Sequence, residues 1–173
     1  LMRRLLARAH ARGVRVRPAR ELLGVHRFGA TTLEVLAPAP EDGEALYPEL
    51  SPNDNSLVLR VAHRGSAALW GGDIEDYGET YRVERAGPRL RAQLVKEPHH
   101  GSKTSSSAAF VEATWAEHVV FCTGRGNRYG FPHAPVKARW ARAGARAWDT
   151  AVHGQLTFWL TLRGIEARSH LAR

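Results

Sequence analysis

The sequence predicts a mixed α/β sandwich, because short strands and amphipathic helices alternate along it and two β-hairpins interrupt the alternation. Its 173 residues are enough for one domain with a single buried core. The hydrophobic fraction of 43% argues against disorder, and no apolar run approaches the roughly 20 residues that a membrane-spanning helix needs. The single cysteine, Cys122, excludes a disulfide framework and a cysteine-ligated zinc cluster. We therefore interpret residues 1–173 as one α/β domain.

The N-terminal elements follow from periodicity and turn residues. Residues 1–11 place apolar side chains at helical spacing with arginines on the other face, and Gly13 ends this predicted helix. Short strands are predicted over 14–16 and 31–36, the second closed by a proline-rich turn at 37–40, whereas 22–28 stays ambiguous. Acidic residues and prolines over 41–54 predict an exposed loop.

The elements after residue 55 are marked more clearly. Strands over 56–62 and 67–70 flank a tight turn that contains Gly65, which predicts a hairpin. Cys122 ends an apolar strand and is interpreted as a small core residue. The remaining predicted elements are a helix over 76–85, a strand over 90–95, a serine-capped helix over 105–114, a strand over 119–122, a glycine-rich loop over 124–132, a helix over 135–143, a strand over 145–148 and a final hairpin over 155–162 and 165–168.

Side chains that can bind metals follow the ends of several predicted strands. Asp73 follows one strand through two glycines, and His99 and His100 follow another through Pro98. Neighbouring strand ends in one sheet meet at the same rim, where a carboxylate with several imidazoles suits Zn²⁺ or Mn²⁺. His133 follows a third strand, and His153 precedes the final hairpin. The alternative is that the aspartate is a turn or helix cap and that the histidines lie in an exposed loop.

The cations are mostly arginine. The chain has 22 arginines against three lysines, and its formal net charge is +8. Codon usage in a GC-rich genome explains such a bias, but arginine is also the side chain that binds phosphate through two parallel hydrogen bonds. The glycine-rich stretch over 124–130 lacks the Lys-Ser/Thr pair of a nucleotide-binding P-loop, so it is not interpreted as one.

Four motifs occur in a fixed order: SPNDNSLVL over 51–59, GDIE over 72–75, PHHGSKTS over 98–105 and NRYGFPH over 127–133. Asp149-Thr150 and His153-Gly154 follow them. Together they resemble the metallo-β-lactamase-like domain of the ComEC family, the DNA-uptake channel proteins of natural competence. The resemblance implies an αββα sandwich with a metal site on the rim between two sheets. The first ligand motif of that superfamily, His-x-His-x-Asp-His, is absent from this sequence, and residues 1–11 match the helix that follows it. The chain is thus expected to be the C-terminal two-thirds of the domain, without its first strands.

The function implied by the resemblance is metal-dependent hydrolysis of DNA. The substrate would be the single strand that is not transported, and the domain would lie outside the cytoplasm in a bacterial inner-membrane protein, next to the channel part of that protein. The expected cofactor is Zn²⁺ or Mn²⁺, with two ions in a complete domain. Asp73 matches the bridging ligand, and either His99 or His100 matches a terminal ligand. His133 would be the catalytic residue that stabilises the phosphorus or protonates the leaving oxygen.

The resemblance also places DNA-binding groups around these ligands. Tyr77, Tyr129 and Phe131 could stack on bases. Asn55 stands near the position at which many members of the superfamily have a metal-ligand histidine. The family usually shows a histidine where Phe131 stands. Phosphate contacts are expected from the neighbouring loops, through Ser102, Lys103, Thr104, Arg125, Asn127 and Arg128.

Two other functions fit the same residues. One is a stand-alone metallohydrolase that acts on a small phosphodiester or ester. The other is a metal-free DNA-binding or scaffold module, which the absence of the first ligand motif favours. The missing strands also predict unpaired sheet edges, unless the chain is longer, a partner covers the gap or residues 14–36 fill it.

Overall fold

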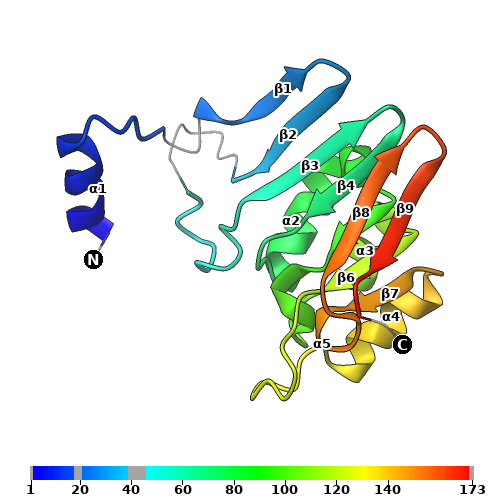
Figure 1. The fold of residues 1–173 in the computed structure, drawn as a ribbon. Coiled ribbons are helices and arrows are strands. Elements are labelled where there is room, and N and C mark those ends of the chain that lie inside the picture. The colour runs from blue at the N-terminus through cyan, green and yellow to red at the C-terminus, as the bar shows by residue number, and fades with distance from the viewer. Residues whose placement is uncertain (1, 18–20, 39–45, 172–173) are drawn as a thin grey trace.

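The computed structural model describes residues 2–17, 21–38 and 46–171. Its larger sheet has seven strands in the order β1-β2-β3-β4-β5-β6-β7, and β8 and β9 form a second sheet (Figure 1). The helices are α1 (Met2–Ala11), α2 (Asp76–Ala86), α3 (Ala108–Thr114), α4 (Ala134–Arg142) and α5 (Thr150–His153). The strands are β1 (Gly24–Phe28), β2 (Thr31–Ala37), β3 (Val58–His63), β4 (Ser66–Trp70), β5 (Leu94–Lys96), β6 (His118–Phe121), β7 (Arg146–Asp149), β8 (Leu156–Thr161) and β9 (Gly164–Ser169).

The direction of the strands decides where a site can form. Strands β1 to β4 pair antiparallel, each with the next strand in the sequence. Strands β4 to β7 pair parallel, because helices or long loops connect them. The carboxyl ends of four neighbouring strands therefore lie on one rim, which is where open α/β sheets build their sites.

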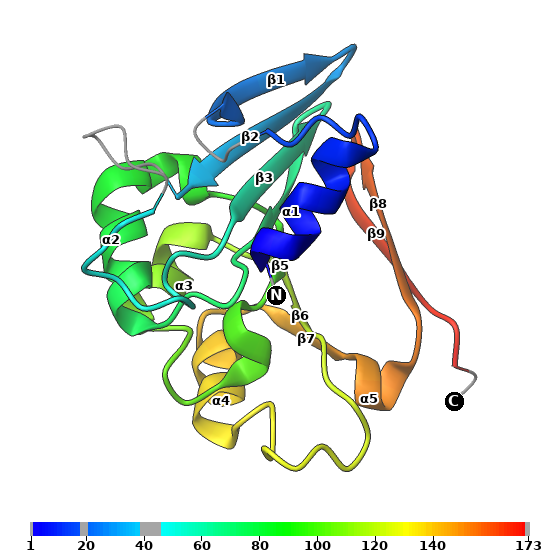
Figure 2. The same ribbon diagram turned by 90° about the vertical axis from the view of Figure 1, so that its left-hand side faces the viewer.

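The large sheet is covered on both faces. Helices α2, α3 and α4 pack on one face, over a core that includes Leu69, Phe110 and Trp140 (Figure 2). The β8–β9 hairpin packs on the other face, where Trp148 meets Phe158 at 5.7 Å between ring centroids. The described residues thus form helix, sheet and sheet layers, and the predicted α/β sandwich is confirmed.

Most predicted elements are present, and the differences have local causes. Residues 14–16 are exposed coil rather than a strand, because no strand of the described chain lies beside them to pair with. The strand predicted over 90–95 is limited to Leu94–Lys96, since Gly87–Leu90 form a short 3₁₀ helix with Pro88 in its first turn. The helix predicted from residue 105 begins at Ala108, because the Ser107 side chain caps it by accepting the Phe110 N–H.

The prediction that residues 41–54 form an exposed loop is partly wrong. Its residues 41–45, like 39–40 of the proline-rich turn, lie outside the described part of the chain. In the remainder, Tyr47, Leu50 and Asp54 are buried. Asp54 is buried because its Oδ1 atom accepts the N–H groups of Glu75 (2.7 Å) and Gly78 (3.1 Å) at the start of α2. The loop is therefore part of the scaffold under the rim.

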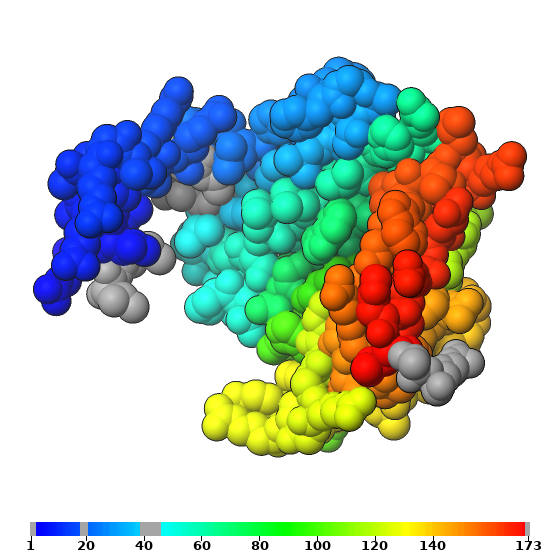
Figure 3. Space-filling view, in the orientation of Figure 1, coloured from blue at the N-terminus to red at the C-terminus, as the bar shows by residue number. Residues whose placement is uncertain are grey.

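The N-terminal region extends the large sheet. The ambiguous stretch over 22–28 forms β1, which pairs with β2, and β2 in turn pairs with β3. Helix α1 lies apart from the two sheets, beyond the end of β1 and β2 (Figures 1 and 3). None of the described helices is long and apolar enough to cross a bilayer.

Candidate functional site

A cavity of about 450 Å³ opens at the carboxyl rim of the parallel strands. Loops that follow β4, β5 and β6 form its walls, so the predicted ligands Asp73, His99 and His100 are brought together. The lining residues are Asp73, His99, His100, Cys122, Thr123, Gly124, Asn127, Tyr129 and Phe131. The rim expected from strand ends alone is therefore present.

Two glycines bring Asp73 close to the histidine loop. A Cβ atom on Gly71 would lie 2.6 Å from Cγ of Pro98, and one on Gly72 would lie 2.5 Å from Cβ of Ser56. Gly72 also has a φ of +63°, which side-chain-bearing residues rarely adopt. The backbone N–H of Asp73 then donates to Oγ of Ser56 at 3.0 Å. This close packing fixes where the carboxylate enters the cavity.

The two histidines sit on an unusual backbone. His99 has φ 48° and His100 has φ 57°, so both adopt the left-handed conformation. That conformation costs about 1–2 kcal/mol for a residue with a side chain. Strain of this kind concentrates at functional sites, where the surrounding structure holds it. Here the left-handed backbone follows the end of β5, and the imidazoles of both residues line the cavity.

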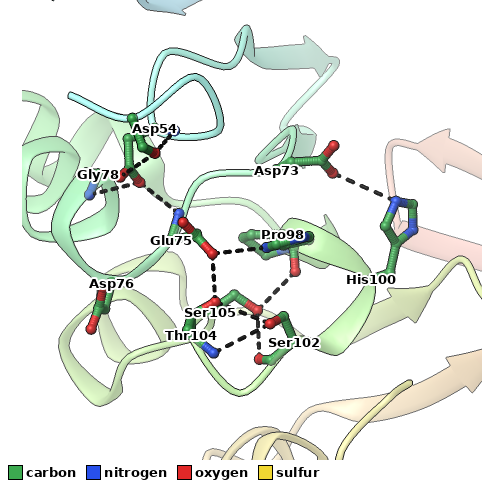
Figure 4. A network of polar contacts seen from close by, with 12 residues as sticks. Asp54, Asp73, Glu75, Asp76, Gly78, Pro98, His100, Ser102, Thr104 and Ser105 are labelled. Atoms are coloured by element: carbon green, nitrogen blue, oxygen red, sulfur yellow. Dashed lines mark hydrogen bonds and ion pairs between the residues drawn. The ribbon is translucent and has the colours of Figure 1, made fainter. Parts of the chain in front are cut away.

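Asp73 and His100 have the geometry of two ligands of one ion. Nδ1 of His100 donates to the Cys122 carbonyl oxygen at 2.9 Å, which leaves Nε2 unprotonated in the neutral ring. That Nε2 lies 3.6 Å from Oδ1 of Asp73 (Figure 4). Two ligands at zinc-like distances in a tetrahedral shell are about 3.4 Å apart. Metal-binding histidines characteristically donate their other N–H to a carbonyl or carboxylate oxygen, as His100 does.

This pair alone does not complete a coordination shell. Within the described ranges, no group of three or more His, Cys, Asp or Glu side chains is arranged to hold a metal ion. Lys96 instead places its Nζ atom 3.9 Å from Oδ1 of Asp73, and it donates to the Gly72 carbonyl oxygen at 3.1 Å. The rim therefore offers two ligand-type side chains, Asp73 and His100, with an ammonium group beside Asp73.

His99 has different surroundings from His100. Its Nδ1 atom lies 3.3 Å from Oε1 of Glu75. That carboxylate oxygen also accepts the Thr104 hydroxyl at 2.7 Å. The His99 ring meets the Phe131 ring edge-on at 6.0 Å. Of the two histidines, His100 is the one that faces Asp73.

Several predicted phosphate-binding side chains shape the loops. Oγ of Ser102 and Oγ1 of Thr104 are 3.0 Å apart and hydrogen-bonded to each other. Asn127 spans the glycine-rich loop, because its Oδ1 accepts the Phe131 N–H at 2.9 Å and its Nδ2 donates to the Phe131 carbonyl at 2.8 Å. Of the six residues predicted to bind phosphate, only Asn127 lines the cavity.

The three predicted phosphate-binding cations lie on exposed loops near these groups. Lys103 is exposed in the loop after β5. Nε of Arg125 donates to the Ala151 carbonyl at 2.9 Å, and Nη2 of Arg128 donates to the Tyr129 hydroxyl at 2.7 Å. Tyr129 stacks on Phe131 with ring centroids 5.4 Å apart. One wall of the cavity is thus a pair of stacked rings with arginine close by.

Three further residues lie elsewhere than the sequence suggested. Cys122 is exposed and lines the cavity instead of filling the core, because β6 ends at Phe121. His133 lies outside the cavity lining and packs edge-on against Phe131 at 5.3 Å. The Asn55 side chain accepts the Tyr47 N–H at 2.8 Å and donates to the Tyr47 carbonyl at 2.9 Å, so it holds a loop.

His153 also stays away from the other predicted ligands. Its Nδ1 atom accepts the backbone N–H of Asp149 at 3.0 Å, and its ring packs edge-on against Trp148. The Asp149 carboxylate caps α5 by accepting the Ala151 N–H. Among the described residues, this closing segment therefore joins the ends of β7 and β8 and does not line the cavity.

A buried polar cluster lies beneath the histidine loop. Oε1 of Glu97 accepts the hydroxyl groups of Ser105 (2.9 Å) and Ser106 (2.8 Å). Ser106 in turn accepts the indole N–H of Trp140 at 2.9 Å. Burial raises the pKa of Glu97 to about 8, although both serine hydroxyls act to lower it. The loop that carries the histidines is thus anchored to the helical core.

Comparison with known proteins relates the chain to competence proteins. It is 36% identical over 119 residues to Competence protein ComA of Neisseria gonorrhoeae, 32% identical over 108 residues to ComE operon protein 3 of Bacillus subtilis, and 31% identical over 104 residues to Recombination protein 2 of Haemophilus influenzae. The matches cover 69%, 62% and 60% of this chain, but only 17%, 14% and 13% of those proteins. No family model matches the chain.

Proposed function

Because this chain carries a ComEC-like domain, we propose that it acts on DNA during DNA uptake, as a metal-dependent phosphodiester hydrolase that degrades the strand not transported. The observation that carries this proposal is the facing pair of Asp73 and His100 in a cavity at the carboxyl ends of the parallel strands. The chain spans less than a fifth of each of the three relatives. A role in DNA uptake, which would belong to a whole protein of that kind, is therefore part of the proposal.

Each group at the rim has a defined task in this proposal. Asp73 and His100 would hold the divalent ion, Zn²⁺ or Mn²⁺, and the hydrogen bond from Nδ1 of His100 to the Cys122 carbonyl would leave Nε2 free to bind it. When bound, such an ion neutralises charge on the phosphate and lowers the pKa of the attacking water. Lys96 lies beside Asp73 and contributes positive charge for a phosphate oxygen.

The walls of the cavity suit a single strand of DNA. The stacked rings of Tyr129 and Phe131 offer a face on which bases can stack without sequence preference. Lys103, Arg125 and Arg128 on the adjoining loops bind backbone phosphates. Single-stranded DNA is accordingly the proposed substrate, and the channel part of the parent protein is the proposed partner that delivers it.

The decisive experiment separates metal binding from hydrolysis. The purified chain is titrated with Mn²⁺ by calorimetry, and cleavage of labelled single-stranded DNA is followed with and without Mn²⁺. We expect Asp73→Asn and His100→Ala each to weaken Mn²⁺ binding at least about tenfold and to abolish metal-stimulated cleavage. Asp76→Asn is the matched control, because Asp76 begins α2 and lies outside the cavity lining. The proposal would be refuted if the wild-type chain left DNA intact in Mn²⁺ and both variants bound Mn²⁺ as tightly as the wild-type chain.

His133 has a separate test, because its proposed role is proton transfer to the leaving oxygen. If that role is correct, His133→Ala slows cleavage about 100-fold or more while Mn²⁺ affinity stays at the wild-type value. Unchanged cleavage would limit His133 to packing against Phe131 and to starting α4.

Two observations favour a second function, a metal-free DNA-binding or scaffold module. The Lys96 ammonium lies beside Asp73, and the described residues contain no group of three ligand-type side chains that could hold an ion. If this second function is correct, the chain binds single-stranded DNA equally well with Mn²⁺ and with a chelator. Asp73→Asn would then leave DNA binding unchanged.

A further inference from the structure

The positive charge of the chain is concentrated at its N-terminal end. Seven of the 25 basic residues and none of the 17 acidic residues lie in the first twenty positions. The remaining 153 residues carry 18 basic against 17 acidic residues, which is close to neutral. A genome-wide preference for arginine would raise arginine throughout the chain, so it does not account for this distribution. We call the described part of this region, residues 2–17, the arginine arm.

The arm presents its arginines to solvent. Its six arginines, Arg3, Arg4, Arg8, Arg12, Arg15 and Arg17, are all exposed. Within the described part of the chain, Arg17 is the one member that forms an ion pair, with Glu21 at 3.6 Å. Figures 1 and 3 show α1 standing away from the two sheets. The arginines are therefore available to a partner outside the domain.

Three of these side chains share one side of the helix. Arg4 and Arg8 are four residues apart in α1, and Arg12 continues the turn, since its N–H donates to the Arg8 carbonyl at 3.2 Å. Positions four apart are neighbours on a helix surface, with a rise of about 6 Å between them. Like charges at this spacing destabilise a helix by about 0.2–0.5 kcal/mol per pair. A bound polyanion would remove this repulsion.

We propose that the arginine arm binds the phosphate backbone of single-stranded DNA outside the rim cavity. The choice of DNA as the polyanion rests on the proposed function. Guanidinium groups bind phosphate through paired hydrogen bonds, and a row of them suits a repeating chain of phosphates. The arm differs in charge from the near-neutral rest of the chain, and none of its described residues lines the rim cavity, so it provides a phosphate-binding surface separate from that cavity.

A membrane surface is the other anionic partner to consider, and the arm fits it less well. Helices that lie in a membrane interface need a broad face of apolar side chains. The described side chains of α1 provide Leu5 and Leu6 as large apolar groups, and residues 14–17 alternate valine with arginine instead of extending that face. Charge without a wide apolar face favours a hydrated polyanion.

The test measures how DNA binding depends on salt. Fluorescence anisotropy of a labelled oligothymidylate is recorded over a range of KCl concentrations for the whole chain and for the triple variant Arg4→Gln, Arg8→Gln, Arg12→Gln. Each phosphate contact adds about 0.7 to the slope of log affinity against log salt for single strands, so the variant should lose about 2 from that slope. The matched control is Arg142→Gln, Arg163→Gln, Arg168→Gln, which removes three exposed arginines from other elements.

The outcomes distinguish this inference from the proposed function. Equal slopes for the wild-type chain and the arm variant, or equal losses in the arm variant and the control, would overturn it. Binding of the wild-type chain and the arm variant to phosphatidylserine vesicles is measured as well. If the arm variant lost vesicle binding but kept its DNA binding, the inference would be overturned in favour of a membrane partner. Circular dichroism checks that the variant keeps its helix content. The salt series is recorded with a chelator present, so neither metal binding nor cleavage at the rim contributes to the slope, and a failure of the proposed function leaves the arm tested by itself.

Discussion

The rim loops and the arginine arm present their polar groups in opposite ways. At the rim, His100 is held by the Cys122 carbonyl, and Asp73 enters through two glycines that pack against neighbouring loops. In the arm, six exposed arginines have one ion pair among them within the described chain. A pair of side chains held in place suits chemistry that depends on distances of a few tenths of an ångström. An exposed row of charges suits binding that tolerates many geometries.

This difference extends to the packing beneath each region. The histidine loop rests on Glu97, Ser106 and Trp140, all of them buried. The large apolar side chains that the structure describes in the arm, Leu5, Leu6, Val14 and Val16, are exposed. Substitutions under the rim should therefore destabilise the whole domain, whereas substitutions in the arm should not.

Trp140→Ala should have the largest effect on stability. The side chain is fully buried among the helices, and its indole N–H is bound by Ser106. Removing a buried tryptophan typically lowers the free energy of unfolding by about 3–5 kcal/mol. Urea denaturation of the variant and the wild-type chain measures this loss. Trp115→Ala is the matched control, since Trp115 is 70% exposed and lies under the guanidinium of Arg91. It should cost less than about 1 kcal/mol. Equal losses in the two variants would contradict the assigned core.

Glu97→Gln should change how stability depends on pH. Burial raises the pKa of Glu97 from 4.5 to about 8 in the folded chain. Between those values the unfolded chain releases a proton that the folded chain retains, so this group makes stability fall as pH rises from about 4.5 to 8. The slope is at most about 1.4 kcal/mol per pH unit for one proton. The amide introduced by this substitution cannot ionise, so the difference in stability between the variant and the wild-type chain should change in the variant's favour across this range. Parallel profiles would show that Glu97 ionises normally.

Asp54→Ala should destabilise the domain by a smaller amount. Its carboxylate accepts two backbone N–H groups at the start of α2, from Glu75 and Gly78. Loss of a capping side chain costs about 1–2 kcal/mol. Asp54→Asn keeps an oxygen in the same place and should recover most of that loss in the same denaturation assay. If alanine and asparagine cost the same, the cap contributes little.

The rim was predictable because it depends on strand order alone. Asp73, His99 and His100 each follow a strand, and parallel neighbours end at one edge whatever their register. Lys96 was missed because its approach to Asp73 depends on the pairing of Lys96 with Trp70, which no local pattern encodes. The side chain that faces Asp73 could not be chosen between His99 and His100 either, since that depends on two left-handed residues in succession.

Other differences arose where local pattern and tertiary contacts disagree. Residues 14–16 alternate as a strand does, but a strand needs a partner and the described chain offers none there. Polar residues 51–55 are typical of an exposed loop, yet the side chains of Asp54 and Asn55 bind backbone groups of neighbouring segments. Such contacts join residues that are separated in the sequence, so composition alone could not reveal them.

The smallest effect is expected in the arm, from the double variant Leu5→Ala, Leu6→Ala. Leu5 is 60% exposed, and alanine is the better helix former, so lost packing and gained helix propensity are both small. The unfolding free energy should stay within about 0.5 kcal/mol of the wild-type value. The salt slope of DNA binding should also stay unchanged, because the six arginines remain. A loss of about 2 kcal/mol or more would mean that α1 packs on the sandwich, in which case its arginines would form part of the domain surface and the contrast with the rim would no longer hold.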